Sequence, residues 1–232
     1  ICLLYRSLGL LLSIFILCHG HSVRADEKVY QFVTGDNSEG ERTRWDAVFN
    51  TGHYVYGKEP AEFIKKNIHR FKPGRALDIA MGEGRNAVYL AKKGFQVDGV
   101  DYSEVALRKA RLLAKEHNVS IHTINQDLSK YRIQPGYYDL IVNINYLQRS
   151  LYRRIKNGLK PGGILVFENW TTDQLKNKNA QSLPKEYLLE RGELKRVFSD
   201  FEIIVYHEQN DGKNAVASLI ARKPKQQGGP SQ

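Results

Sequence analysis

The chain has 232 residues, 41% of them hydrophobic, and carries 35 Lys and Arg against 25 Asp and Glu. This length suits one ordinary domain or two small ones, and the composition excludes collagen-like, mucin-like and wholly disordered chains. Both cysteines, Cys2 and Cys18, lie at the start of the chain, so the remainder is neither a disulfide scaffold nor a zinc ribbon. The basic surplus is scattered over predicted helix faces, which favours a solvated surface over a nucleic-acid interface.

The first segment of the chain is typical of a targeting sequence. Arg6 precedes an apolar run over residues 8–18, and Val23-Arg24-Ala25 then offers a cleavage site. The run is shorter than the roughly 20 residues of a bilayer span. We therefore predict a signal peptide or membrane anchor at residues 1–25. The domain is then expected outside the cytoplasm or tethered to a membrane, with a cytoplasmic protein as the alternative.

Residues 26–43 are polar and predict a linker, residues 44–224 a single domain, and residues 225–232 a flexible tail. Within the domain, strand-like and helix-like patterns alternate along the chain. Ser103 is placed to cap one helix, and Pro161 and two glycines end another. The strands are expected at 75–79, 95–101, 119–125, 139–144 and 164–168, and the helices at 86–93, at 104–117 and around Leu151, Ile155 and Leu159.

Strict alternation of strands and helices predicts an α/β fold with right-handed crossovers and helices on both faces of the sheet. The last two strand-like runs, 201–207 and 215–221, are joined by too few residues for a helical crossover. They predict an antiparallel hairpin at the sheet edge. The expected fold is a doubly wound, mostly parallel, seven-stranded Rossmann-like sheet that ends in this hairpin.

The loop after the first strand carries the clearest chemical signal. Gly82 and Gly84 allow a tight turn and a close approach of a ligand to the backbone. Gly82-x-Gly84-x-x-Ala87, with Asp101 at the end of the second strand, satisfies a dinucleotide fingerprint. The same residues, with Ala80, equally satisfy a G-x-G-x-G-like site for S-adenosylmethionine.

Asp78 favours the second alternative. A carboxylate beside dinucleotide phosphates would be repelled by about 4 kcal/mol at a separation of about 4 Å and an effective dielectric constant near 20. S-adenosylmethionine instead brings an ammonium and a sulfonium, for which an acidic residue is favourable. Its own carboxylate could still use the amides at the helix N-terminus.

These residues resemble a class I methyltransferase. The similarity rests on Leu77-Asp78-x-x-x-Gly82-x-Gly84, Asp101, Gln126-Asp127-Leu128 and Tyr138-Asp139-Leu140-Ile141, in that order. Trp45-Asp46-x-x-Phe49, Tyr54-x-Tyr56-Gly57-x-Glu59-Pro60 and Gly82-x-Gly84-Arg85-Asn86 are similar to the tellurite-resistance and thiopurine-methyltransferase branch. The likeness covers about residues 44–224. Ala80 departs from the pattern, where the first glycine is usual.

The resemblance implies a role for each matching residue. Asp78, Gly82 and Gly84 would hold the methionine part of the cofactor, and Asp101 would bind the ribose hydroxyls. Asp127 would accept from the adenine amino group. The cofactor-binding residues implied in this way are Trp45, Tyr54, Tyr56, Asp78, Ala80, Gly82, Gly84, Asn86, Asp101, Tyr102, Ser103, Asp127, Leu128 and Asn143.

The methyl acceptor is less well defined by the sequence. Substrate-side candidates are Asn145, Tyr146, Arg149 and Trp170, none of them a convincing general base. Asp139 starts its strand and is expected to cap or pair structurally. We expect no metal site, because the histidines lack ligand spacing. The expected function is methyl transfer to a small nucleophile such as a thiol, selenium or tellurium species. Alternatives are an RNA or protein methyltransferase, or a non-catalytic cofactor-binding protein, and the sequence leaves the oligomeric state open.

Overall fold

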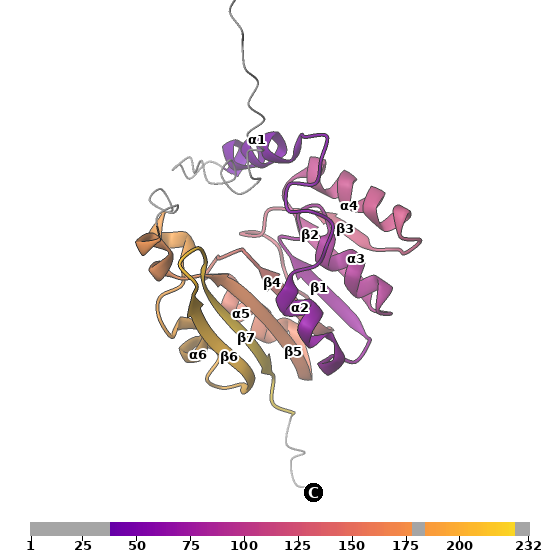
Figure 1. Cartoon of the computed structure of the whole chain (residues 1–232). Coiled ribbons are helices and arrows are strands. Elements are labelled where there is room, and N and C mark those ends of the chain that lie inside the picture. The colour runs from indigo at the N-terminus through magenta and orange to yellow at the C-terminus, as the bar shows by residue number, and fades with distance from the viewer. Residues whose placement is uncertain (1–37, 178–183, 226–232) are drawn as a thin grey trace, which may run out of the picture.

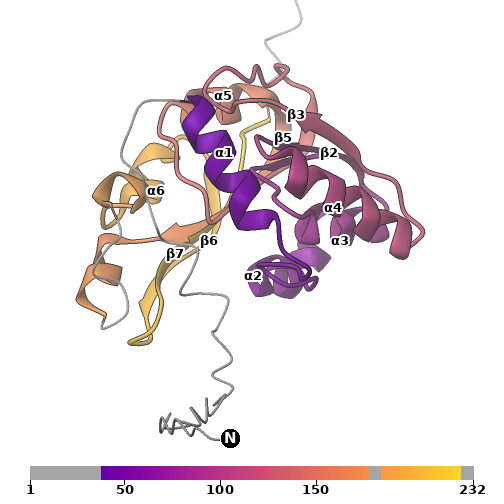
Figure 2. The same cartoon turned by 90° about the horizontal axis from the view of Figure 1, so that it is seen from above.

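The computed structural model describes residues 38–177 and 184–225. The predicted leader at 1–25, most of the predicted linker and the tail after Lys225 lie outside these residues. Within the described ranges, no helix is long and apolar enough to cross a membrane. The two views in Figures 1 and 2 show a central sheet with helices on both sides and the first helix lying across its upper edge.

Helices and strands alternate along most of the described chain, as predicted. The helices are α1 (Ser38–Phe49), α2 (Glu62–Asn67), α3 (Arg85–Lys92), α4 (Glu104–Glu116), α5 (Leu151–Gly158) and α6 (Glu193–Val197), with 3-10 turns at Ile68–Arg70, Thr172–Lys176 and Lys185–Tyr187. The strands are β1 (Arg75–Ile79), β2 (Gln96–Asp101), β3 (His122–Asn125), β4 (Tyr138–Ile144), β5 (Leu159–Trp170), β6 (Glu202–Asn210) and β7 (Ala215–Arg222).

The seven strands form one sheet in the order β3-β2-β1-β4-β5-β7-β6. The pairs among β1 to β5 are parallel, whereas β7 runs antiparallel to both β5 and β6. This confirms the predicted α/β fold and its C-terminal antiparallel hairpin. β1 and β4 are neighbours in the sheet, but the chain continues from β1 towards β2 on one side and from β4 towards β5 on the other. In sheets of this kind, ligands bind in the crevice between the carboxyl ends of two such strands.

Alternate residues of the strands belong to two separate hydrophobic cores, one on each face of the sheet. Ala76, Leu140 and Val166 face α2, α3 and α4, and their partners include Ile64, Leu90 and Leu107. Leu77, Ile141 and Phe167 face the other side, against α5 and α6, with partners that include Leu151, Ile155 and Phe198. Burial on both sides explains why these strands are apolar almost throughout.

Several boundaries differ from those predicted, and three of the differences have a clear physical reason. Helix α1 begins at Ser38, inside the segment predicted as linker, because its docking on the rest of the chain compensates for a polar sequence. Leu159 opens β5 instead of ending α5, since the helix stops at Gly158. The third strand starts at His122 and not at Val119, whose amide instead donates to the carbonyl of Ala114 at the end of α4.

Other local predictions are confirmed. The Ser103 hydroxyl accepts from the Ala106 amide at 3.1 Å and so caps α4. Asp139 has the structural role expected of it: its carboxylate accepts from the Arg75 amide and from the Lys160 ammonium, both at 2.8 Å. These contacts tie the starts of β1, β4 and β5 together at the edge of the sheet opposite the glycine loop.

The loop between β1 and α3 packs directly on α4. Gly84 has a φ of +83°, and a Cβ built there would lie 2.7 Å from the Cβ of Ala110. Both the backbone conformation and the close approach therefore require glycine. This contact places the start of α3 against α4 and so fixes the position of the loop relative to the sheet.

We expect Gly84→Ala to destabilise the fold by about 2–4 kcal/mol, from left-handed backbone strain and steric overlap together. The control is Gly136→Ala, where φ is +58° but nothing lies within 4 Å of the added atom. It should cost only the strain, about 1–2 kcal/mol. Urea unfolding measures both, and equal losses would contradict the packing argument.

Candidate cofactor site

A pocket opens at the carboxyl ends of β1, β2 and β4, underneath α1. Residues from six parts of the chain form it: α1, the segment after α1, the glycine loop with the start of α3, the end of β2, the loop after β3 and the end of β4. The lining residues are Glu41, Trp45, Phe49, Tyr56, Gly57, Ala80, Met81, Gly82, Glu83, Arg85, Asn86, Asp101, Tyr102, Asp127, Leu128, Ile144, Asn145 and Tyr146.

Asp101 organises the centre of this pocket. One carboxylate oxygen accepts from the Gly82 amide at 2.8 Å and the other from the Ser103 amide at 2.9 Å. Burial raises the pKa of Asp101, and these backbone bonds oppose the rise. An ionised carboxylate has about four lone-pair positions, so it keeps capacity to accept ribose hydroxyls while it holds the loop.

Ala80 and Gly82 both adopt left-handed backbone conformations, with φ of +52° and +54°. Ala80 therefore keeps the turn of the glycine that it replaces, at a cost of about 1–2 kcal/mol for an L-residue. A Cβ on Gly82 would lie 3.4 Å from the ring of Phe49. Glycine at this position leaves the space between the loop and α1 open to a ligand.

Asp78 does not line the pocket but lies below the loop, only 1% exposed. Its Oδ2 is buried and has no hydrogen-bond partner among the described residues. Burial raises the pKa of Asp78 to about 7, with Arg85 and the Ala87 amide opposing the rise. Asp78 is thus placed to act on a bound cation through its field rather than by contact. Partial protonation at neutral pH also weakens the charge argument against a dinucleotide.

Tyr102, Asp127 and Leu128 gather at one end of the pocket, where the resemblance places adenine. The Arg42 guanidinium lies 5.5 Å from the centroid of the Tyr102 ring and donates to Asn125 at 3.0 Å. The Asn125 amide in turn donates to the Tyr102 carbonyl at 3.1 Å. Asp127 Oδ1 accepts from the Ser129 amide at 2.8 Å, while Oδ2 lies 4.0 Å from the exposed Lys130 ammonium, beyond hydrogen-bond distance. Oδ2 can therefore still accept from a ligand.

Helix α1 supplies an aromatic wall. Trp45 stacks on Phe49 with ring centroids 5.7 Å apart, and Phe49 meets Tyr56 at 6.3 Å. Asp46 anchors the helix, since its carboxylate accepts from the Ser103 hydroxyl at 2.5 Å. Tyr54 was predicted beside the cofactor, but it turns away, and its hydroxyl donates to the Lys109 carbonyl at 3.1 Å. Ser103 likewise does not line the pocket: it caps α4 and anchors α1 through Asp46.

The acceptor end is formed by Ile144, Asn145 and Tyr146. Asn145 has a φ of +58°, and its amide donates to the Glu168 carbonyl at 2.8 Å. Burial raises the pKa of Tyr146, whose hydroxyl donates to Gln148 at 2.8 Å. Asn143 was predicted to face the transferred methyl. It is 1% exposed, lies behind the lining, and keeps a buried Oδ1 without a partner in the described chain.

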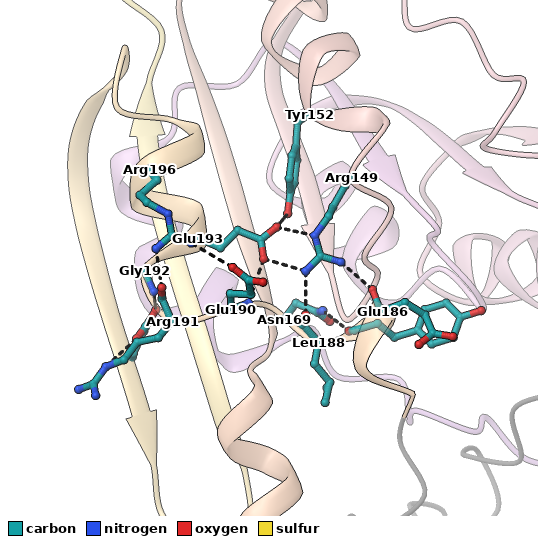
Figure 3. Close-up of polar contacts among 12 residues, drawn as sticks. Arg149, Tyr152, Asn169, Glu186, Leu188, Glu190, Arg191, Gly192, Glu193 and Arg196 are labelled. Carbon is teal, nitrogen blue, oxygen red and sulfur yellow. Dashed lines mark hydrogen bonds and ion pairs between the residues drawn. The ribbon is translucent and has the colours of Figure 1, made fainter.

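Arg149 and Trp170 lie away from the pocket lining, contrary to the prediction that they face the substrate. Figure 3 shows the Arg149 guanidinium forked onto the Glu193 carboxylate, with both bonds at 2.8 Å. Arg149 also donates to the carbonyls of Glu186 and Leu188, each at 2.9 Å. Arg149 is therefore a structural anchor for the segment before α6 and not a substrate ligand.

Seven lining residues were missed as site candidates: Glu41, Phe49, Gly57, Met81, Glu83, Arg85 and Ile144. Glu83 is buried, accepts from the Val55 amide at 2.6 Å and pairs with Lys109. Phe49 and Arg85 were quoted within the motifs but given no role. Their place in those motifs was the available signal, whereas nothing local marked Glu41, which lay in the predicted linker.

The pocket suits S-adenosylmethionine. The carboxylates of Glu41, Glu83, Asp101 and Asp127 give it a negative lining that complements a sulfonium and an ammonium. The Gly82 backbone leaves room beside the loop, and Asp101 offers lone pairs where ribose hydroxyls are expected. No group of three or more His, Cys, Asp or Glu residues in the described ranges could hold a metal ion.

The model of the methyltransferase domain family matches residues 76–163. TehB of Haemophilus influenzae, named as a probable S-adenosyl-L-methionine-dependent methyltransferase, is 28% identical over 170 residues, or 65% of this chain and 58% of TehB. Residues 76–163 thus match a methyltransferase domain, and the similarity to TehB bears out the predicted resemblance to that branch. TehB is itself named for its dependence on S-adenosyl-L-methionine, the cofactor expected from the sequence.

Other comparisons agree on the fold. The crystal structure of Haemophilus influenzae TehB superposes with a TM-score of 0.60 at 23% identity, over 79% of this chain and 67% of that one. The [4+2]-cyclase SpnF gives a TM-score of 0.58 at 18% identity, over 70% and 78%. The ubiquinone biosynthesis O-methyltransferase of Yersinia pestis is 29% identical over 126 residues, half of each chain. This chain thus spans between half and three fifths of the length of these two curated relatives.

We expect Asp101→Ala to weaken binding of S-adenosylhomocysteine at least tenfold, because two ribose hydrogen bonds of about 1 kcal/mol or more each are lost. Calorimetry measures the change, with circular dichroism to verify the fold. An analogue without the 2′ and 3′ hydroxyls is the control, since its affinity should change far less. An unchanged dissociation constant for S-adenosylhomocysteine would remove Asp101 from the site.

The raised pKa of Asp78 makes stability depend on pH. Between about pH 4 and pH 7 the folded protein keeps a proton that unfolded Asp78 loses, so this group makes stability fall as pH rises. Asp78→Asn should remove that fall. Thermal unfolding of the ligand-free protein should therefore show the variant gaining on wild type from pH 4 to pH 7, with a constant difference above that range.

The matched control is Asp139→Asn. Its salt bridge and backbone bond hold the pKa of Asp139 below its ordinary value, so its contribution is present above about pH 4 and is lost as pH falls. The two variants should thus shift the pH profile in opposite senses. Parallel profiles for wild type and Asp78→Asn would contradict the buried-carboxyl interpretation.

Proposed function

We propose that this protein transfers a methyl group from S-adenosylmethionine to a small-molecule nucleophile. One observation carries the proposal: Asp101 faces the pocket while it holds the Gly82 amide, so a ribose acceptor and the glycine backbone form one surface. Asp127 lies at the far end of the same pocket. These features support cofactor binding at the carboxyl edge of the sheet, next to the end of β4.

The bound cofactor supplies a methyl group on a positively charged leaving group. The protein's part is to align the acceptor with that methyl and to exclude water. Helix α1 performs the second task, because its aromatic side chains Trp45 and Phe49 cover the pocket. Ile144, Asn145 and Tyr146 form the surface against which the acceptor lies.

The acceptor end favours a nucleophile that is already anionic. Tyr146 has a raised pKa and is therefore a poor base at neutral pH. Two of the pocket carboxylates are engaged by the protein: Glu83 by Lys109 and the Val55 amide, and Glu41 by Arg44 and the Tyr187 hydroxyl. The other two, Asp101 and Asp127, are assigned to the cofactor. A thiolate or a selenium or tellurium anion needs no base, whereas a hydroxyl or ammonium does. The relation to TehB is consistent with such an acceptor.

Two alternative functions are distinguished by the experiments described below. Asn143-Ile144-Asn145-Tyr146 partly matches the Asn-Pro-Pro-Tyr element of nucleic-acid amino-methyltransferases, but it lacks both prolines. An RNA or protein acceptor is therefore the second candidate. A protein that binds the cofactor without transferring the methyl group is the third.

The test is calorimetric titration of the full chain with S-adenosylhomocysteine and with NADH. We expect S-adenosylhomocysteine to bind and NADH not to bind under the same conditions, because the acidic lining repels two phosphates. The reverse ranking would overturn the proposal.

Acceptor class is then measured by S-adenosylhomocysteine release in the presence of thiols, selenite, tellurite, phenols, tRNA and a protein extract. Methylated thiol or chalcogen products, identified by mass spectrometry, would support the proposed acceptors. Turnover only with tRNA or protein would replace them with the second candidate. Binding without turnover on any acceptor would favour the third.

A further inference from the structure

Arg85 is the cationic side chain among the pocket-lining residues of the described chain, which otherwise include four carboxylates. It belongs to the Gly-x-Gly-Arg-Asn motif and is the first residue of α3, directly after the Gly84 turn. None of the cofactor contacts derived above uses it. The position of a guanidinium in an otherwise acidic pocket therefore calls for a function.

The contacts of Arg85 leave most of its hydrogen-bonding capacity open. Nη1 donates to the Tyr56 carbonyl at 3.1 Å, and the guanidinium carbon lies 5.7 Å from the centroid of the Tyr56 ring. Within the described ranges no carboxylate lies within 4 Å of its nitrogens. A guanidinium carries five N–H donors in a fork that matches a carboxylate or a similar oxyanion.

Arg149 shows what a satisfied guanidinium looks like in this protein. It makes two bonds to the Glu193 carboxylate and two more to backbone carbonyls. Arg85, by contrast, is partly buried without an ion pair of this kind in the described chain, and burial lowers its pKa. A buried guanidinium in this state gains more than an exposed one from an added anion.

Three carboxylates compensate the charge of Arg85 without filling its fork. Asp78, Glu168 and Glu83 interact with it electrostatically, yet none of the three lies within ion-pair distance. Glu168 is held elsewhere, since its carboxylate accepts from the Ser218 hydroxyl at 2.6 Å. The cation is thus retained in the protein while its donors stay available on the pocket side.

We propose that Arg85 binds the anionic group of a ligand in this pocket, a carboxylate or a comparable oxyanion, through its guanidinium fork. The inference rests on the proposed function and deepens it. Two sources can supply that chemistry: the methionine carboxylate of the cofactor, or an anionic group on the methyl acceptor. In either case Arg85 is a binding residue that orients the methionine or acceptor end relative to the transferred methyl.

The test compares two ligands on three variants of the full chain. S-adenosylhomocysteine carries the amino-acid carboxylate, and 5′-methylthioadenosine lacks it while keeping the adenosyl part. The variants are Arg85→Gln, Arg85→Lys, which keeps the charge but not the fork, and Arg108→Gln. Arg108 is exposed on α4, so its variant controls for net charge. Calorimetry gives each dissociation constant, and selenite and mercaptoacetate are titrated into each S-adenosylhomocysteine complex.

If the cofactor supplies the anion, Arg85→Gln weakens S-adenosylhomocysteine about tenfold or more and leaves 5′-methylthioadenosine unchanged. If the acceptor supplies it, both nucleoside ligands bind as in wild type, and binding of selenite or mercaptoacetate is lost. Arg85→Lys should fall between Arg85→Gln and wild type in either case, and Arg108→Gln should match wild type.

Two results would overturn the inference. One is an Arg85→Gln variant that binds every ligand and both anions as wild type does. The other is an equal loss for S-adenosylhomocysteine and 5′-methylthioadenosine, which would assign Arg85 a structural role in the pocket. A wild-type protein that binds neither nucleoside contradicts the proposed function itself, and that outcome is visible before any variant is measured.

Discussion

The two hydrogen bonds of the Asp101 carboxylate are the interaction on which the site depends. One oxygen holds the glycine loop through the Gly82 amide, and the other holds the start of α4 through the Ser103 amide. Ser103 then caps α4 and donates to Asp46, which anchors α1. A single buried carboxylate therefore joins the floor, one side and the cover of the pocket. Its negative charge is tolerated in a buried position because backbone amides, and not water, solvate it.

Charge balance in the interior follows from the same arrangement. The loop after β1 brings Asp78, Glu83 and Arg85 close together, and the cost of burying each charge is offset in a different way. Glu83 pairs with Lys109 and a backbone amide, Asp78 has its pKa raised to about 7, and Arg85 keeps its donors toward the pocket. The fold thus places acidic and basic groups where a ligand that carries both positive and negative groups can pair with them.

The sequence was informative wherever the signal was local. Alternation of strands and helices, the Ser103 cap and the short connection before β7 all depend on neighbouring residues, and the structure confirms them. The signal failed where distant contacts decide the outcome. The polar sequence of α1 does not favour a helix by itself, and its start at Ser38 depends on docking through Asp46 and Trp45. Arg149 resembled a substrate ligand because its partner, Glu193, is far away in the chain.

The way α1 is attached has a consequence for ligand access. A few aromatic contacts, the Asp46 carboxylate and the side-chain bonds of Glu41 and Arg42 hold this helix. The strands beneath it are instead buried on both faces. Local opening of α1 is therefore much less costly than unfolding of the sheet. Its amides should exchange with solvent faster than those of β1 and β4, and a ligand in the pocket should slow that exchange. A ligand can therefore reach the pocket when α1 alone detaches, while the sheet stays folded.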